Sequence, residues 1–191
     1  MYHIIRIRST SSEYNGKCTK LFLKVNREKT VVAYAGKIKF LGYGFYKSAK
    51  GYGLCVHAKS KGKMKAKVKE LTSRCCVNDY ENWKTSLKRF IVGWVNYYKL
   101  ASMANYLKSI DEWMRRRIRM VFWKKWKRVR TRWKNLLKLG VSNSNAGNLA
   151  CSRKGYWRIA DSPVMKTALS NDKLEKAGFQ YFYSYYSKSV A

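Results

Sequence analysis

The sequence predicts a mainly α-helical protein with a small antiparallel β unit near its N-terminus. Two patterns support this prediction. Between residues 21 and 56, apolar and polar residues alternate in short runs, which is typical of strands with one buried face. From residue 59 onward, apolar residues recur at three- and four-residue steps, which is typical of amphipathic helices. We therefore expect a β unit over 1–58, a helical bundle over 59–139 and short helices over 140–191.

The β unit is predicted from strand-like runs joined by polar turns. Lys47–Gly51 has the composition of a hairpin turn, because it combines polar residues with a glycine. Gly42 and Gly44 interrupt the run before it, so we expect a bend or a close backbone approach there. The predicted runs are 21–25, 31–32, 38–46 and 52–56.

Four longer helices are predicted next. Asn78, with Glu81 three residues later, has the spacing of an N-terminal capping pair for the second helix, and Gly140 is expected to end the fourth. Arg115, Arg116 and Arg119 are expected to project from the side of the third helix opposite its apolar face. The expected apolar faces, helix by helix, are Met64, Val68 and Leu71; Leu87, Ile91, Trp94, Val95 and Tyr98; Leu107, Ile110, Met114, Ile118, Val121 and Phe122; and Trp133, Leu136 and Leu137.

The last part of the chain predicts short helices. Ser162 and Pro163 form a favourable helix start, with serine as the cap and proline at the first helical position. The segment 171–177 is expected to be a helix that Gly178 closes. The segment 153–158 combines a glycine turn with basic and aromatic residues. It is expected either to contact a ligand or to pack the C-terminal helices, and the sequence leaves both open.

The charge of the chain is strongly positive, with 42 Lys and Arg against 10 Asp and Glu and a net charge of +32. Closely spaced cations repel one another unless a polyanion neutralises them. Nucleic acid, an anionic membrane surface and an acidic protein are the candidates. Aromatic residues make up 15% of the chain, which favours nucleic acid because rings stack on bases while Lys and Arg neutralise phosphates.

The densest basic segment runs from Arg115 to Lys134, where eleven of twenty residues are Lys or Arg. The segment contains no carboxylate, so ion pairing along a helix does not explain it. Arginine binds phosphates through two parallel hydrogen bonds, which suits a structured RNA backbone. We expect this segment to bind a polyanion, and the alternative is a solvated helix face.

Membrane, metal and catalytic motifs are missing from the sequence. No apolar stretch approaches the roughly 20 residues that span a bilayer, so we expect a cytoplasmic protein without a membrane partner. The five cysteines are odd in number and form no CxxC pair, so we expect no metal, no disulfide and no cofactor. Asp111 and Glu112 are the only adjacent carboxylates, and neighbours on a helix diverge. We expect no catalytic residues.

Five segments carry a family resemblance. LKVNREKT at 23–30 and KFLGY at 39–43 resemble the last palm motif of group II intron reverse transcriptases. GWVNYY at 93–98 and IDEWMRRRIR at 110–119 resemble the maturase-specific segment of that family, and RKGYWRIADSP at 153–163 resembles its C-terminal region. The fingers and most of the palm, with its magnesium-binding aspartates, have no counterpart in this sequence.

The resemblance implies a function. In that family the intron RNA is the splicing catalyst and the protein clamps it into its active fold, while the thumb also grips the template–primer duplex. The C-terminal region helps to bind intron RNA and target DNA. The resemblance implies a palm-like β unit over 1–58, a thumb and maturase-specific domain over 59–139 and a nucleic-acid-binding extension over 140–191. The expected partners are structured intron RNA and target DNA, in a ribonucleoprotein.

Three alternatives remain open. In the first, the chain is the C-terminal half of a split RNA-directed DNA polymerase whose palm and fingers come from a separate chain. In the second it is a remnant without a selected role, and in the third it binds membrane surfaces. The residues expected to bind RNA are Lys61, Lys63, Lys65, Lys67, Lys99, Arg115, Arg116, Arg119, Lys124, Lys125, Lys127, Arg128, Arg130, Arg132, Lys134, Arg153, Lys154 and Arg158.

Overall fold

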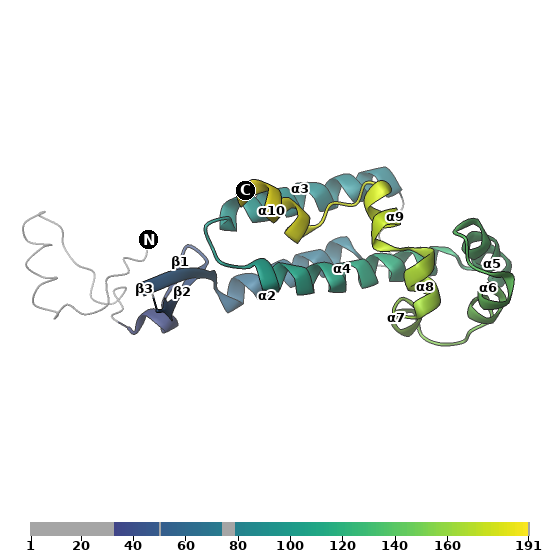
Figure 1. Ribbon diagram of the computed structural model, residues 1–191, viewed down its shortest axis with the longest axis horizontal. Helices are drawn as coiled ribbons and strands as arrows, with labels where there is room; N and C mark the ends of the chain where they lie inside the picture. Colours follow the sequence, from purple (N-terminus) through teal and green to yellow (C-terminus); the bar gives the residue numbers. More distant parts are fainter. Residues whose placement is uncertain (1–32, 50, 74–78, 191) are drawn as a thin grey trace, which may run out of the picture. The chain divides into compact units, whose positions relative to one another are not determined.

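A computed structural model of the protein describes residues 33–49, 51–73 and 79–190 (Figure 1). Within these residues a three-stranded sheet comes first and helices follow, so the predicted mainly α fold with an antiparallel β unit is confirmed. The strands predicted at 21–25 and 31–32 lie outside the described residues. The chain divides into two compact units, which comprise Met1–Lys63 with Leu100–Met103, and Met64–Lys99 with Ala104–Ala191.

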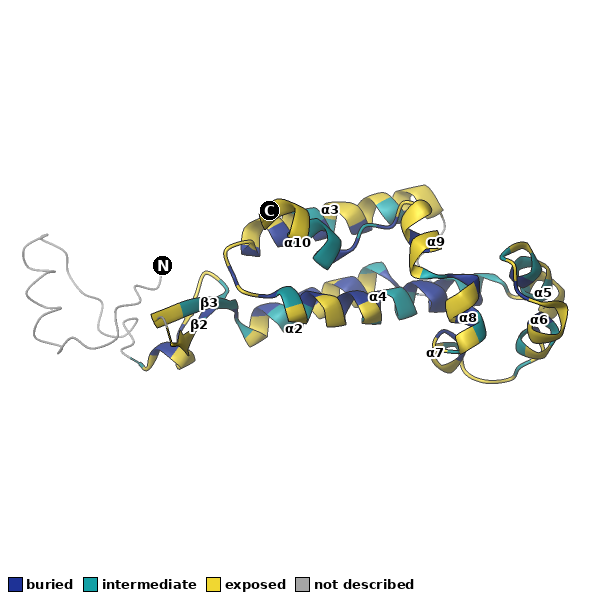
Figure 2. Cartoon of the chain, in the orientation of Figure 1, coloured by how far each residue is buried: buried dark blue, intermediate teal, exposed yellow. Residues whose placement is uncertain are grey.

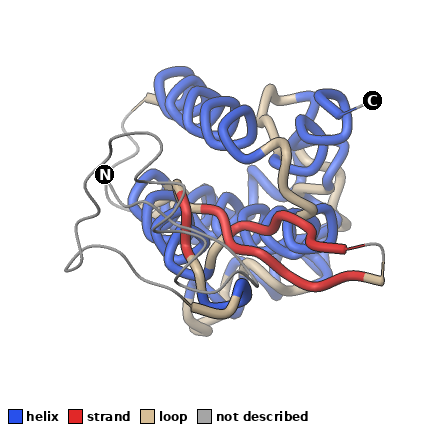
Figure 3. Tube along the Cα trace, turned by 90° about the vertical axis from the view of Figure 1, so that its left-hand side faces the viewer, coloured by secondary structure: helices blue, strands red, loops and turns tan. Residues whose placement is uncertain are grey.

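The sheet of the first unit is antiparallel with strand order β1-β2-β3 (Figure 3). The run predicted as one strand at 38–46 is divided by a tight turn at Leu41 and Gly42, whose φ angles are 49° and 86°. The bend predicted at Gly42 is therefore confirmed, and glycine tolerates this left-handed conformation because it has no Cβ. The elements of this unit are η1 (Ala35–Lys37), β1 (Lys39–Phe40), β2 (Tyr43–Ser48) and β3 (Gly51–Val56).

Helix α2 (Ala58–Leu71) begins directly after β3. The His57 ring caps its first turn, because Nδ1 accepts a hydrogen bond from the Lys59 backbone N–H at 3.1 Å. The Ser60 hydroxyl donates to the Gly42 carbonyl at 2.9 Å, which ties the helix start to the turn of the sheet. Further along, Met64 and Val68 are buried, as predicted from their spacing.

The core of the second unit lies where α3, α4 and α10 pack together, and Figure 2 shows their buried faces in dark blue. The predicted apolar faces are largely confirmed, although Leu71, Trp94, Phe122, Trp133 and Leu137 are only half-buried. Asp79 caps α3 by accepting a hydrogen bond from the Glu81 N–H at 3.0 Å, whereas the predicted cap Asn78 lies outside the described residues. The bounds are α3 (Tyr80–Tyr98), α4 (Ala104–Lys125) and α10 (Phe182–Val190).

Five shorter helices lie between α4 and α10. Ser162 caps α8 through a hydrogen bond from the Met165 N–H, with proline at the first helical position, as predicted. Gly140 and Gly178 follow α5 and α9 with φ angles of 83° and 91°, so the predicted helix ends are also confirmed. Among the described helices, none is long and apolar enough to cross a membrane. The bounds are α5 (Val129–Lys138), α6 (Asn143–Ala150), α7 (Tyr156–Ile159), α8 (Pro163–Ala168) and α9 (Asn171–Lys176).

Candidate nucleic-acid interface

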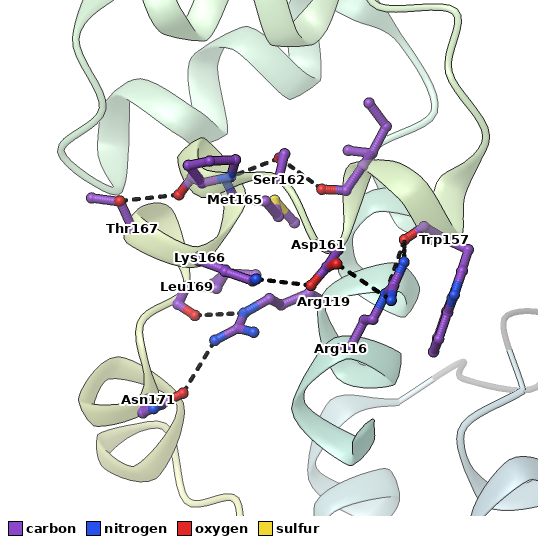
Figure 4. A network of polar contacts seen from close by, with 12 residues as sticks. Arg116, Arg119, Trp157, Asp161, Ser162, Met165, Lys166, Thr167, Leu169 and Asn171 are labelled. Carbon is purple, nitrogen blue, oxygen red and sulfur yellow. Dashed lines mark hydrogen bonds and ion pairs between the residues drawn. The ribbon is translucent and has the colours of Figure 1, made fainter. Parts of the chain in front are cut away.

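The structure divides the basic segment 115–134 into two parts that differ in exposure. In the first half, on α4, arginine side chains turn toward other parts of the second unit. Arg119 is 6% exposed, and its Nε donates to the Leu169 carbonyl at 2.9 Å while Nη2 donates to Asn171 Oδ1 at 3.2 Å (Figure 4). The prediction that Arg119 projects away from the apolar face is wrong, because the residues that end α8 and begin α9 cover this side of α4.

Arg116 fastens α7 to α4. Its Nε and Nη2 both donate to the Trp157 carbonyl, at 3.2 and 3.0 Å, and its guanidinium lies 4.1 Å from the centre of the Trp157 ring. Its Nη1 also lies 3.4 Å from Asp161 Oδ2, and Lys166 contacts the other oxygen of that carboxylate at 2.9 Å. The hydrogen bond from Lys166 is the main cause that lowers the pKa of Asp161.

Arg117 and Arg115 complete this set of internal contacts. Arg117 donates to the Thr72 hydroxyl, and its Nη2 donates to the carbonyls of Lys69 and Thr72, both at 3.1 Å. It thereby binds carbonyls at the end of α2, where the helix dipole is negative. Arg115 lies over the Tyr181 ring, 4.5 Å from its centre. These four arginines of α4 therefore contact four different segments. Their guanidinium groups face carbonyls, a carboxylate or aromatic rings of the second unit.

In the second half of the basic segment, the cations that face solvent are Lys127, Arg128, Arg130 and Lys134. Arg130, Lys134 and Lys138 recur every four residues along α5 and are exposed, and we call them the α5 stripe. No described carboxylate forms an ion pair with any of the three. Lys138 is not among the residues predicted to bind RNA, although its four-residue step from Lys134 places it on the same helix face.

Arg132 lies on the opposite side of α5 from the stripe. Its Nε donates to the Trp126 carbonyl at 2.9 Å and its guanidinium lies 4.8 Å from the centre of the Trp123 ring. Trp133 Nε1 donates to Asn143 Oδ1 at 2.9 Å, which joins α5 to α6. The α5 stripe is therefore held outward because the other face of its helix is fixed on both sides.

The segment 153–158 packs against α4, and its contact with RNA stays a prediction. Its rings face α4, since Lys124 lies 5.0 Å from the centre of the Tyr156 ring and Arg116 covers Trp157. Its cations Arg153, Lys154 and Arg158 are exposed.

The remaining cations predicted to bind RNA are mostly at the surface. Lys67 is engaged by Glu70 at 2.7 Å, and Lys61, Lys124 and Lys125 are half-buried. The exposed ones are Lys63 and Lys65 on α2, Lys99 after α3, and Lys127 and Arg128 before α5. The role of all these residues in RNA binding stays a prediction.

A family model covers the helices that carry most of these cations. Residues 61–140 match the model of the group II intron maturase-specific domain. Over these residues the chain is similar to a group II intron maturase-specific domain. Two of the five segments that suggested the family, 93–98 and 110–119, fall within the match. A comparison with curated proteins finds no match. The domain indicates a function related to that of group II intron maturases and implies an interaction with intron RNA.

One carboxylate of the maturase-specific domain holds α10 in place. Asp111 is 2% exposed, and its two oxygens accept hydrogen bonds from the backbone N–H groups of Phe182 at 2.9 Å and Tyr183 at 2.8 Å. It thereby satisfies the free donors at the start of α10 from another helix. Glu112 is exposed, so the predicted divergence of the two neighbours is confirmed. Burial raises the pKa of Asp111 to about 6, although both N–H groups and Arg115 oppose the shift.

We expect Asp111 to make the stability of the fold depend on pH. Its pKa rises from the ordinary 3.8 to about 6, so between these values the folded state holds a proton that the unfolded state releases. The contribution of Asp111 to the free energy of unfolding therefore falls as the pH rises through this window, and it is constant above it. Thermal unfolding of Asp111→Asn should lack this part of the pH slope. Asp161→Asn, whose exposed carboxylate has a lowered pKa, should keep it, and an unchanged slope in Asp111→Asn would contradict the assignment.

Proposed function

We propose that the chain binds folded group II intron RNA and stabilises the fold in which that RNA splices, as part of a cytoplasmic ribonucleoprotein. The observation that carries this proposal is the α5 stripe within the maturase-specific domain. Arg130, Lys134 and Lys138 are exposed, share one helix face and have no carboxylate partner among the described residues. Cations left unpaired in this way are available to phosphates.

The spacing of the stripe fits a nucleic-acid backbone. Residues four apart on a helix are separated by about 6 Å along the axis, so the stripe extends for roughly 12 Å. It can therefore contact phosphates of more than one nucleotide at once. Each phosphate contact releases condensed counterions, which makes binding favourable and sensitive to salt. The exposed cations Lys127 and Arg128 directly before α5 add to the same local charge.

We propose further that the chain performs no chemistry of its own. Three of its described carboxylates make separate structural contacts: Asp79 caps α3, Asp111 caps α10 and Asp161 pairs with Lys166. No three His, Cys, Asp or Glu side chains in the described part of the chain lie together as a metal site. Polymerase chemistry uses carboxylates clustered around Mg²⁺, and the described carboxylates do not supply such a cluster.

The test of the proposed function is a salt titration of binding to two RNAs. The purified full chain is titrated with a folded group II intron RNA and with a mixed-sequence RNA duplex. Both affinities should fall steeply with salt because phosphate contacts dominate. Near physiological salt the intron should keep an advantage of about tenfold, which corresponds to roughly 1.4 kcal/mol. Coinciding curves would mean that the chain is a non-specific polycation, and would refute recognition of the intron fold.

A further inference from the structure

The second unit contains a pocket that lies, except for Arg116, outside the matched maturase-specific domain. It is formed by α6, α7, the start of α8 and Arg116 of α4, and its volume is about 490 Å³. This volume lies within the range of about 300–1,000 Å³ that is usual for small-molecule sites. A lone phosphate or metal ion is much smaller than that. The size therefore points to a ligand larger than a single ion.

The charged side of the pocket is set up for an anion. Its cations are Arg116, Lys154 and Arg158 and its one carboxylate is Asp161. Asp161 is already shared between Arg116 and Lys166, so its charge is neutralised. Lys154 and Arg158 are exposed and form no ion pair with any described residue. These two cations are available to a phosphate, and the Arg158 guanidinium can bind it through two hydrogen bonds.

The other walls suit a nucleobase. The half-buried Leu149 and Val164 give the pocket an apolar surface that the face of a flat ring can contact. Asn145 and Asn148 project into it from successive turns of α6, and each amide offers both a donor and an acceptor. Amide side chains of this kind read the edges of bases. Cations, amides and apolar carbons in one pocket match the phosphate, the edge and the face of one nucleotide.

We propose that this pocket binds a single unpaired nucleotide that projects from the bound RNA. The proposal rests on the proposed function, because it assigns a ligand to part of the same RNA-binding protein. Sequence-specific recognition of RNA relies on unstacked bases in loops and bulges, since the groove edges of paired RNA are poorly accessible. The pocket gives the chain a means of selecting a structured RNA that cations along a helix do not provide.

The test compares two RNA hairpins that differ by one bulged nucleotide, with each of the four bases at the bulge. The full chain should prefer at least one bulged hairpin by about 5- to 100-fold over the unbulged one, the range expected for good base contacts. Asn148→Ala should abolish this preference without changing the affinity for the unbulged hairpin, because no charge is removed and alanine favours helix. Ser144→Ala, an exposed position of the same helix outside the pocket, should behave like the unaltered chain.

A second measurement does not depend on a variant. A 4-thiouridine at the bulge should crosslink on irradiation to peptides within residues 145–164. Crosslinks confined to other segments, or equal affinity for bulged and unbulged hairpins, would overturn the pocket assignment. If the preference for the folded intron persists in that case, the proposed function still stands, whereas loss of that preference as well refutes both. Free nucleoside monophosphates are also tested as competitors of the bulged hairpins for binding to the chain. Binding of the monophosphates by a chain that lacks any bulge preference would identify a free nucleotide as the ligand and overturn the RNA assignment.

Discussion

Replacement of Arg119 by alanine is expected to lower the free energy of unfolding by about 3 kcal/mol, since hydrogen bonds to charged groups contribute about 1.5–3 kcal/mol and buried acceptors left unpaired add to the cost. The Leu169 carbonyl and the Asn171 amide oxygen both lose their donor. Arg119 is also almost fully buried, so its removal leaves unfilled space between α4 and the short helices. The contact between α4 and the α8–α9 segment should therefore weaken first.

Thermal unfolding followed by circular dichroism measures this effect. A loss of this size should lower the midpoint by roughly 6–12 °C in a chain of this length. Arg130→Ala removes the same type of side chain from the exposed α5 stripe and should leave the midpoint nearly unchanged. The opposite pattern, with normal stability and weakened RNA binding in Arg119→Ala, would show that Arg119 contacts RNA and not the C-terminal helices.

Neutralising the α5 stripe is expected to weaken RNA binding by about fifty- to two-hundredfold near physiological salt, if each of the three cations neutralises one phosphate. The variant is Arg130→Gln with Lys134→Gln and Lys138→Gln. The slope of log affinity against log salt should become shallower by about 2–3 for the same reason. Stability should change little, because these side chains are exposed and have no ion-pair partner among the described residues.

A matched control has the same change in charge at another place. Lys88→Gln, Arg89→Gln and Lys188→Gln remove two lysines and one arginine from exposed positions of α3 and α10. Its affinity and salt slope should stay much closer to those of the unaltered chain. Equal losses in the two variants would mean that net charge alone drives binding, and that α5 is not the contact surface.

The sequence predicted the fold class because periodicity is a local property. Met64 and Val68 on α2, and Leu107, Ile110 and Met114 on α4, are buried where their spacing placed them. Helix caps and helix ends that depend on neighbouring residues alone were predictable for the same reason. Examples are the N-cap Ser162 and the glycines Gly140 and Gly178. The division of the run at 38–46 was only partly predictable. Gly42 signalled a bend, but the left-handed conformation of Leu41 had no signal in its residue type.

The candidate site was less predictable, because contacts between residues far apart in the sequence decide which of its cations are internal and which are exposed. Arg119 and Arg130 are alike in sequence terms, and only the position of Leu169 and Asn171 makes the first internal and the second exposed. The pocket was not foreseen, since Arg116 joins residues about thirty to fifty positions later in the chain. Asp111 likewise finds its partners at Phe182 and Tyr183. Sequence spacing alone does not report such contacts.

The arginines of α4 also affect how the protein is made. Arg116, Arg119 and Asp111 bond with segments that are synthesised after α4, from α7 to α10. During translation α4 leaves the ribosome before those partners exist, so its arginines are unpaired cations next to ribosomal and messenger RNA. Docking of the helices α7 to α10 buries Arg119 and engages Arg116 and Asp111, while the α5 stripe stays exposed. Folding thus removes Arg119 from the charges that the nascent chain offers to RNA.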